Sequence, residues 1–429
     1  MTEPQSPPSW YARTAVSGGI SRPPLTGDAS CDVCIIGGGL TGISAALNLA
    51  ERGYDVVLIE QQRIGWGASG RNGGQICTAF SGGMEKIESA IGKADARRAW
   101  DMALEAKRIL ADRASRHGIE CDLSWGYLYA ALSRHQQRGL GEMRDQWVDD
   151  YGYDQPVALL SPEEMQEKVA STRYVGGLYD PEAGHLHVLD YLLGLARAAQ
   201  AAGARLHEGT QALSITTGAQ PGVRTASGTI RCQHLILATN GYLGRLEPRL
   251  RPYVMPVGSF VCTTEVIGQE RLAGLIADNL AIAECNHILN YFRPTRDGRL
   301  MFGGGANYSA IDPPSLRFYL TRKLHKVFPQ LADVKIDQAW SGLIGITASR
   351  IPHFGRLDGN VYYAQGFSGQ GVALSGLAGL LMAEAVSGQA ERLDVFGRIR
   401  HMPFPGGPLR TPALVLAMLY FRLLDLVGR

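Results

Sequence analysis

The chain has 429 residues, more than the roughly 100 to 200 of a usual domain, and this length predicts two domains. Hydrophobic residues make up 45% and charged residues 19% of the chain, as is typical of globular proteins. The 42 basic and 40 acidic residues leave a formal net charge of +2, which argues against a nucleic-acid partner.

The seven cysteines argue against two further kinds of structure. They are scattered, and no second Cys-x-x-Cys pair or pair of histidines completes a zinc module or a disulfide scaffold. Cys31 and Cys34 form one Cys-x-x-Cys inside an apolar run. We expect them to be buried in a strand and not to form a redox or metal site.

The first residues lack the basic start and apolar core of a signal peptide, so we expect no cleavage and a cytoplasmic location. Pro and Gly are frequent up to about residue 29, which predicts an extended arm. Residues 31–37 are then a short apolar run, 40–52 carry apolar residues at helical spacing, and 55–60 are a second apolar run. This order predicts a β–α–β unit.

Helical patterns follow, notably at 94–117, and near residue 121 the sequence changes to short aromatic, β-prone pieces. A helix and a strand return at 188–202 and 234–241, and residues 253–308 alternate as in an antiparallel sheet. A strand at 361–371 runs into a glycine turn, with a helix pattern at 372–386. We predict an α/β Rossmann-like domain formed by residues 1–118, 185–248 and 338–429, interleaved with an antiparallel-sheet α+β domain formed by 119–184 and 249–337.

A dinucleotide fingerprint lies between the first predicted strand and helix, at Gly37, Gly39 and Gly42. The first glycine permits a tight turn, the second lets a pyrophosphate approach the backbone, and the third lets the helix pack on the strand. The helix N-terminus then faces the phosphates. Glu60 ends the next strand and can accept hydrogen bonds from both ribose hydroxyls, which disfavours a 2′-phosphate.

Three glycine-rich segments favour FAD over NAD. Residues 65–75 read GWGASGRNGGQ, which indicates backbone pressed against a ligand, although a mobile surface loop has a similar composition. Residues 235–241 form an apolar strand that ends in a small-residue turn. Residues 366–376 precede a helix whose N-terminus would stabilise the negative charge of a reduced flavin; a plain core helix is the alternative.

Together these motifs resemble the D-amino-acid oxidase (DAO) family of flavoproteins, and GASGRNGGQ with GFSGQGVALSGLAGLLMAE is most like its γ-glutamylputrescine oxidase branch. The implied fold is an FAD-binding domain of the glutathione-reductase type with a substrate domain. The resemblance implies that FAD is bound by Gly37, Gly39, Leu40, Thr41, Gly42, Glu60, Gln61, Ser69, Gly70, Arg71, Asn72, Gly73, Gly74, Gly366, Phe367, Ser368, Gly369, Gln370 and Gly371.

The sequence departs from its relatives in three places. Sarcosine oxidases tether the flavin through a cysteine in the last third of the chain, but the last cysteine here is Cys285. Some relatives use an early histidine, whereas the first here is His117. We therefore expect non-covalent FAD. Gln370 stands where γ-glutamylputrescine oxidases are expected to have histidine.

The resemblance implies hydride transfer from the carbon beside the substrate nitrogen to flavin N5, and hydrolysis of the resulting imine. No side chain is assigned as a catalytic base. Arg350 is placed like residues that bind a substrate carboxylate, and Tyr291 and Arg293 could line the same cavity. His185 and His187 are expected to lie at a domain crossover and not to bind metal; no metal site is predicted.

Several properties stay open at this point. The substrate could be a γ-glutamylputrescine-like polyamine derivative, sarcosine or a D-amino acid, and the electron acceptor could be oxygen or a respiratory quinone. A non-catalytic flavin protein is a third reading. Residues 411–428 are apolar and could dock on the protein or contact a membrane surface. The oligomeric state has no sequence signal.

Overall fold

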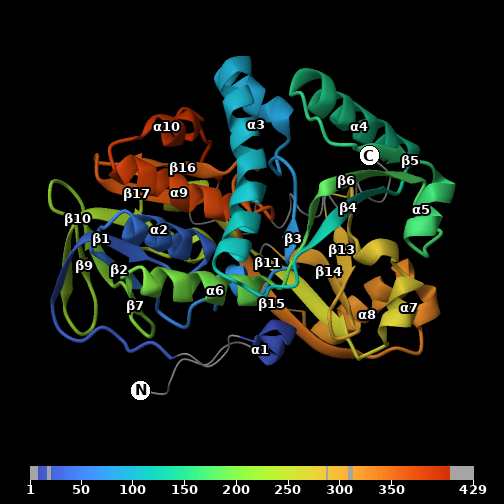
Figure 1. Cartoon of the computed structure of the whole chain (residues 1–429), viewed down its shortest axis with the longest axis horizontal. Helices are drawn as coiled ribbons and strands as arrows, with labels where there is room; N and C mark the ends of the chain where they lie inside the picture. The colour runs from blue at the N-terminus through green and yellow to red at the C-terminus, as the bar shows by residue number, and fades with distance from the viewer. Residues whose placement is uncertain (1–7, 17–20, 287, 308–312, 406–429) are drawn as a thin grey trace.

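The computed structural model describes residues 8–16, 21–286, 288–307 and 313–405. Figure 1 shows two sheets side by side, with the long helix α3 (Met84–Arg116) standing between them. Within the described residues, the first sheet has the strand order β16-β17-β10-β1-β2-β7, and the second β15-β11-β14-β13-β12-β4-β6-β3.

The first sheet confirms the predicted Rossmann-like domain. Its strands β1 (Ala29–Ile36), β2 (Val56–Ile59), β7 (Arg205–His207), β10 (Thr229–Leu237) and β17 (Val361–Gln365) are parallel, and Ile35 of β1 pairs with Leu58 and Ile236. β16 (His353–Leu357) is antiparallel at the edge. The hairpin of β8 (Ser214–Thr216) and β9 (Gly222–Arg224) extends from β10.

Helices α2 (Leu40–Glu51), α6 (Val188–Ala201) and α9 (Leu374–Val386) cover one face of this sheet (Figure 1). α2 and α9 approach closely because small residues line the contact: a Cβ placed on Gly379 would lie 2.6 Å from Ala45 N. Ser44 Oγ donates to Gly376 O at 2.6 Å and accepts from Arg113 of α3 at 2.9 Å. This contact ties the last segment of the chain to the first β–α–β unit.

The second sheet is antiparallel except where β4 (Ser124–Ala131) pairs in parallel with β12 (Ala281–Glu284). Its other strands are β3 (Gln75–Ile76), β5 (Ala158–Leu160), β6 (Gly176–His185), β11 (Met255–Thr264), β13 (Asn290–Pro294), β14 (Leu300–Asn307) and β15 (Ile336–Ile346). One face packs Phe260, Ile282 and Phe292 against α8 (Leu316–Val327). The opposite face turns toward the first domain.

The strands locate the changes between the two sheets. β6 ends at His185, where the second predicted piece of the first domain begins. The predicted boundary at 338, however, cuts through β15, which pairs with β11 along its whole length in the second sheet. The chain therefore returns to the first domain only after Ile346. β3 also pairs with β6 in the second sheet, although residues 1–118 were predicted to belong to the first domain.

The predicted N-terminal extended arm is wrong at one point, because residues Trp10–Thr14 form helix α1. Ser9 caps it by accepting from Ala12 N, and Trp10 and Tyr11 are fully buried. Figure 1 places α1 below the junction of the two sheets. Two aromatic side chains thus supply enough buried surface to fix a short helix.

The remaining described helices surround this framework. α3 begins ten residues before the predicted helix at 94–117. Its first part is separated from the rest by a break at Gly92, which has φ 79° and ψ 163°. The others are α4 (Arg134–Asp145), α5 (Pro162–Lys168), α7 (Gln269–Ala273) and α10 (Glu391–Gly397). In the described part of the chain, no helix is both long and apolar enough to cross a membrane. Residues 411–428 lie outside the described residues.

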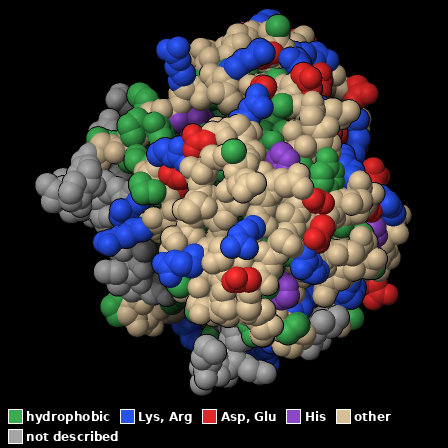
Figure 2. Space-filling view, turned by 90° about the vertical axis from the view of Figure 1, so that its left-hand side faces the viewer, with side chains coloured by type: hydrophobic (Ala, Val, Ile, Leu, Met, Phe, Trp, Pro, Cys, Tyr) green, Lys and Arg blue, Asp and Glu red, His purple; other side chains and the backbone are tan. Residues whose placement is uncertain are grey.

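Basic and acidic side chains are interspersed on the face shown in Figure 2. This pattern agrees with the near balance of 42 basic and 40 acidic residues.

Candidate functional site

The candidate site lies where the parallel strands of the first sheet end. β1, β2, β10 and β17 run in the same direction, so the residues that follow them meet at one edge. Gly37, Glu60, Asn240 and Gly366 lie there. Asn240 Oδ1 accepts from Gly366 N at 2.9 Å, and a Cβ placed on Gly37 would lie 2.7 Å from Ala238 O. Ligands of open α/β sheets bind at this edge.

Each of the three fingerprint glycines is required for a different steric reason. Gly37 has φ 114°, a conformation that side-chain-bearing residues rarely adopt. A Cβ on Gly42 would lie 2.0 Å from Gly37 O, so the helix can pack on the turn only without a side chain. A Cβ on Gly39 would meet Ser69 Oγ at 2.7 Å. α2 begins directly after Gly39, and its first turn carries no acidic side chain.

Glu60 is aimed at this turn from the end of β2. Its Oε2 accepts from Gly38 N at 2.8 Å and its Oε1 accepts from Gln62 N at 2.8 Å. Burial raises the pKa of the Glu60 carboxyl, while the hydrogen bond from Gly38 N opposes that rise. Further donors, such as ribose hydroxyls, would offset the desolvation. Gln61, the next residue, is exposed.

The glycine-rich loop at 65–75 folds back onto the helix N-terminus. Ser69 Oγ accepts from Leu40 N at 3.0 Å. Arg71 lies over the Trp66 ring at 4.7 Å and donates to Ser341 O at 2.9 Å, so the loop is fixed against β15. Asn72 closes the loop by accepting from Gly74 N at 2.7 Å. Contacts with α2 and β15, together with contacts inside the loop, therefore hold the loop in place, which argues against a mobile surface loop.

The turn after β17 is conformationally strained. Gly366 has φ 74°, Ser368 φ 54° and Gly369 φ 96°, and a positive φ is unusual for serine. Ser368 N donates to Gly345 O at 2.9 Å, and Ser81 Oγ donates to Ser368 O at 3.0 Å. Gln370 Oε1 is buried and has no hydrogen-bond partner among the described residues. This oxygen is therefore available to accept a hydrogen bond from a bound group.

These residues fit a dinucleotide. The cradle at Gly37–Gly42 admits no side chain, the carboxylate of Glu60 faces it, and α2 and α9 both begin there without an acidic first turn. In the turn after β17, the buried Gln370 Oε1 has no hydrogen-bond partner among the described residues. The structure thus brings together all four segments that the sequence assigned to the cofactor.

Tyr291 and Arg293 lie on the same face of β13, toward the glycine-rich loop. The Tyr291 ring fits between two glycines: a Cβ would lie 2.5 Å from it on Gly73 and 2.0 Å on Gly303. A substrate role for Tyr291 stays a prediction, although the geometry places it beside the cofactor loop.

Arg293 is bonded within the protein, and its predicted substrate role stays a prediction. It is 1% exposed, and its five N–H groups are all used within the protein. Its Nε donates to Gly73 O, its Nη1 to Pro294 O and His185 Nδ1, and its Nη2 to Tyr11 Oη and Leu186 O, at 2.8 to 3.4 Å. No donor is left for a carboxylate.

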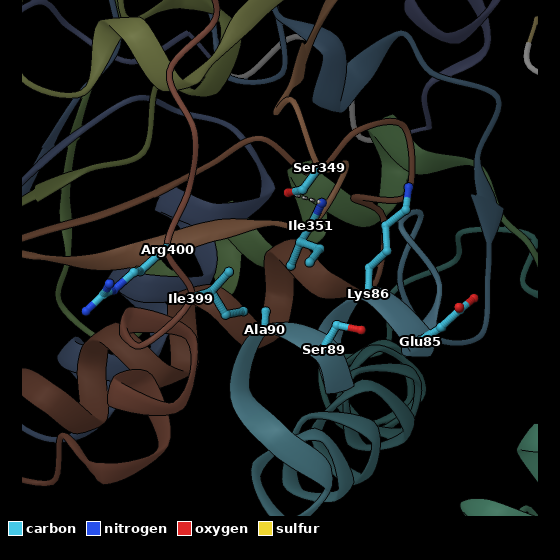
Figure 3. A pocket seen from close by; sticks show the side chains of 8 residues that line it. All are labelled: Glu85, Lys86, Ser89, Ala90, Ser349, Ile351, Ile399 and Arg400. Atoms are coloured by element: carbon cyan, nitrogen blue, oxygen red, sulfur yellow. Dashed lines mark hydrogen bonds between the residues drawn. The ribbon is translucent and has the colours of Figure 1, made fainter.

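Arg350 is not brought together with Tyr291 and Arg293. It lies in the turn after β15 with φ 64°, and its backbone packs against Gly82. Beside this turn is a surface cleft of about 340 Å³, in which Figure 3 shows Ile351 and Ile399 facing the start of α3. Glu85 and Arg400 point outward from its two sides. None of the residues that line the cleft belongs to the predicted cofactor segments.

His185 and His187 are buried and neutral. Burial lowers the pKa of His185 to about 3 and that of His187 to about 2, with nearby arginines adding to the shift. His185 bonds Asn279 O and Arg293, and His187 caps α6 by accepting from Asp190 N. The part of the chain that the structure describes holds no cluster of three or more His, Cys, Asp or Glu suited to a metal.

Two groups of residues near the site were not assigned from the sequence. Asn240, within the predicted 234–241 strand and turn, holds the Gly366 turn, and only its position after a parallel strand could have indicated this. Tyr127 and Tyr129 of β4 face residues 75–78, at the end of the glycine-rich loop, and their alternation in LSWGYLYAAL was the available signal.

Comparisons with known proteins agree with this site. Residues 32–385 match the family model described as FAD dependent oxidoreductase (DAO). The chain is 43% identical over 406 residues to "Gamma-glutamylputrescine oxidoreductase" of Escherichia coli (strain K12), covering 94% of this chain and 95% of that protein. It is 37% identical over 409 residues, 94% of each chain, to "Probable oxidoreductase OrdL" of Haemophilus influenzae.

Among solved structures, glycine oxidase from Geobacillus kaustophilus has a TM-score of 0.73 at 24% identity, covering 87% of this chain and 100% of that one. L-proline dehydrogenase from P. horikoshii has a TM-score of 0.72 at 22% identity, covering 86% and 96%. The family match spans most of the chain and includes every cofactor segment described above. The chain therefore belongs to the DAO family of FAD-dependent oxidoreductases, and FAD is its cofactor.

Proposed function

We propose that the enzyme oxidises the carbon–nitrogen bond of a γ-glutamylated diamine such as γ-glutamylputrescine. The observation that carries this proposal is the 43% identity to gamma-glutamylputrescine oxidoreductase over 94% of the chain. The geometry of Arg293 supports it, because this buried arginine has no donor left for the carboxylate of an amino-acid substrate. The structure does not explain why Gln370 stands where γ-glutamylputrescine oxidases are expected to have histidine.

Bound FAD supplies a hydride acceptor at N5. The substrate carbon beside the nitrogen gives up a hydride, the nitrogen lone pair forms the carbon–nitrogen double bond, and water then splits the imine into an aldehyde and ammonia. The protein must hold the amine neutral and close to the cofactor and keep water away until then. The face of the second sheet that carries Tyr291 is suited to this, since it is aromatic and largely buried.

We also propose that the two electrons pass to oxygen, giving hydrogen peroxide, or to a respiratory quinone. Peroxide formed in stoichiometric amount with the aldehyde would establish the oxidase, and aldehyde formed only with an added quinone would establish the dehydrogenase. A cytoplasmic location is proposed because all seven cysteines are free thiols, including the neighbouring Cys31, Cys34 and Cys232.

Anaerobic titration of the holoenzyme tests the substrate. The visible flavin band should bleach with γ-glutamylputrescine and much less with putrescine, sarcosine, glycine or D-alanine. Bleaching by an amino acid but not by γ-glutamylputrescine would favour the second candidate, a D-amino-acid or sarcosine oxidoreductase. Absence of bleaching with every compound would contradict the proposed function.

A further inference from the structure

The face of the second sheet that turns toward the cofactor loop carries a group of aromatic and thiol side chains. Tyr127 and Tyr129 lie on β4 with ring centroids 4.8 Å apart, and Tyr291 lies on β13. Cys77 and Cys285 accompany them. We call these five residues the tyrosine face.

The tyrosine face is connected with two of the predicted cofactor segments, the glycine-rich loop and the turn after β17. At one end the Tyr291 ring covers Gly73 of the glycine-rich loop. Tyr127 Oη donates to Gln75 Oε1 at 3.1 Å, just beyond that loop. The chain then passes Cys77 and reaches Ser81, which bonds Ser368 of the strained turn. Residues 73–81 therefore connect the tyrosine face with the two segments that hold the cofactor.

The tyrosine face is partly open and largely desolvated. Tyr129, Tyr291, Cys77 and Cys285 each keep part of their surface accessible. Burial nevertheless raises the pKa of Cys77 to about 11 and those of Cys285 and Tyr291 to about 12. Tyr129 Oη is buried close to the backbone of Thr78, and no group among the described residues meets it in hydrogen-bond geometry.

The charged groups around this face favour a cation. Asp180 and Glu182 lie near Lys107, which donates to Thr78 at 2.9 Å and to Tyr153 at 3.2 Å. Arg293, the other nearby cation, has every donor occupied. Neither cation can offer a carboxylate two free donors. Aromatic ring faces, in contrast, attract an ammonium group within about 6 Å of the ring centroid.

We propose that the tyrosine face binds the methylene chain and the incoming ammonium end of the amine, which loses its proton to water before the hydride leaves, with Tyr129 as a specificity-determining residue. This proposal rests on the proposed function, because it names the part of that substrate that reaches the cofactor. The γ-glutamyl carboxylate then remains away from the tyrosine face. An α-amino acid, whose carboxylate would have to enter with the amine, is disfavoured.

An unreactive ligand tests this separately from turnover. Butyltrimethylammonium has no nitrogen lone pair, so it cannot form an imine, and valerate is a carboxylate of similar shape. Calorimetric titration of the holoenzyme should show the cation binding at least tenfold more tightly than valerate. Tyr129→Leu should weaken cation binding about tenfold, in line with a desolvated cation–π contact, whereas Tyr129→Phe should stay within about twofold.

The matched control is Tyr174→Leu, because Tyr174 precedes β6, is buried in the hydrophobic cluster on the opposite side of the sheet and should leave cation binding unchanged. With γ-glutamylputrescine, Tyr129→Leu should raise KM more than it lowers kcat. Tighter binding of valerate, or equal cation binding by wild type and Tyr129→Leu, would overturn the proposal. An enzyme that binds the cation as expected but is not reduced by γ-glutamylputrescine would refute the proposed function and leave the tyrosine face as a cation site.

Discussion

At the scale of single residues, Glu60 is the side chain that we expect to bind the ribose beside the fingerprint turn. It accepts from Gly38 N and Gln62 N, and burial raises its pKa. Glu60→Gln would turn an amide donor toward one of these N–H groups and remove charge-assisted bonds worth about 1.5 to 3 kcal/mol. FAD affinity, measured by titrating apoprotein and following flavin fluorescence, should fall about 10- to 100-fold. Glu51→Gln on the exposed end of α2 is the control and should bind FAD like wild type.

Arg293 illustrates a buried residue whose function is to satisfy backbone groups. Arg293→Met would leave the carbonyls of Gly73, Leu186 and Pro294 without this donor and should lower the free energy of unfolding by about 3 to 5 kcal/mol. Urea denaturation measures this, with exposed Arg322→Met as the control, expected within about 0.5 kcal/mol. If Arg293→Met were as stable as wild type and lost only substrate affinity, the sequence-based substrate role would be right.

At the scale of elements, α1 joins the two domains. Trp10 Nε1 donates to Asp297, Tyr11 accepts from Arg293, and Thr14 contacts His187 at 3.0 Å. Because Trp10 is fully buried, Trp10→Ala should lower the free energy of unfolding by about 3 to 5 kcal/mol. Chemical denaturation in the presence of excess FAD measures this. Phe318→Ala, at a side chain 63% exposed, should have little effect; equal effects of the two changes would show that α1 does not hold the domains.

The elements also show what the sequence could predict. The β1–α2–β2 unit was predictable because two apolar runs flank a helix-period segment, and the glycines mark the turn between them. α1 was not, because five residues are too few for a hydrophobic period to show. The boundary near 338 was misplaced because β15 leads directly into the turn at 347–352, with no change in composition where the sheets change.

Side-chain roles were less predictable than elements. Tyr291 and Arg293 were expected to be able to line one cavity, but the sequence did not distinguish the two faces of their strand. Only contacts with Tyr11, Gly73 and Leu186, far apart in sequence, show that Arg293 has no free donor. Arg350 was predicted to bind a substrate carboxylate because its segment resembles the family. Its actual position depends on the geometry of the turn after β15, which the sequence does not show. That the predicted cofactor segments lie together was predictable because each directly follows a parallel strand or fills a glycine-rich turn.

At the scale of the whole molecule, the chemistry of the cysteines bears on cofactor attachment. The two thiols on the tyrosine face, Cys77 and Cys285, have pKa values raised by burial to about 11 and about 12, so neither is a thiolate at neutral pH. Only the thiolate is a good nucleophile. Acid precipitation of the holoenzyme should therefore leave all FAD in the supernatant and a colourless pellet. A yellow pellet would show a covalent link.

The buried histidines predict how stability of the whole molecule depends on pH. Desolvation lowers the pKa of His185 to about 3, His187 to about 2 and His353 to about 3, below the ordinary value of 6.5. Each is neutral in the folded state, and each takes up a proton on unfolding below about pH 6.5. The free energy of unfolding should therefore fall as pH decreases from about 6.5 toward about 3, by roughly 1.4 kcal/mol per pH unit for each histidine.

Urea denaturation with excess FAD at about pH 7 and about pH 5 measures this slope. His353→Gln should make it shallower by one histidine, because glutamine can still bond Tyr363 and Gln365 but does not titrate. His135→Gln, at an exposed position, should leave the slope unchanged. If stability were the same at both pH values, or if His353→Gln and His135→Gln had equal slopes, the buried histidines would not control the acid sensitivity of the fold.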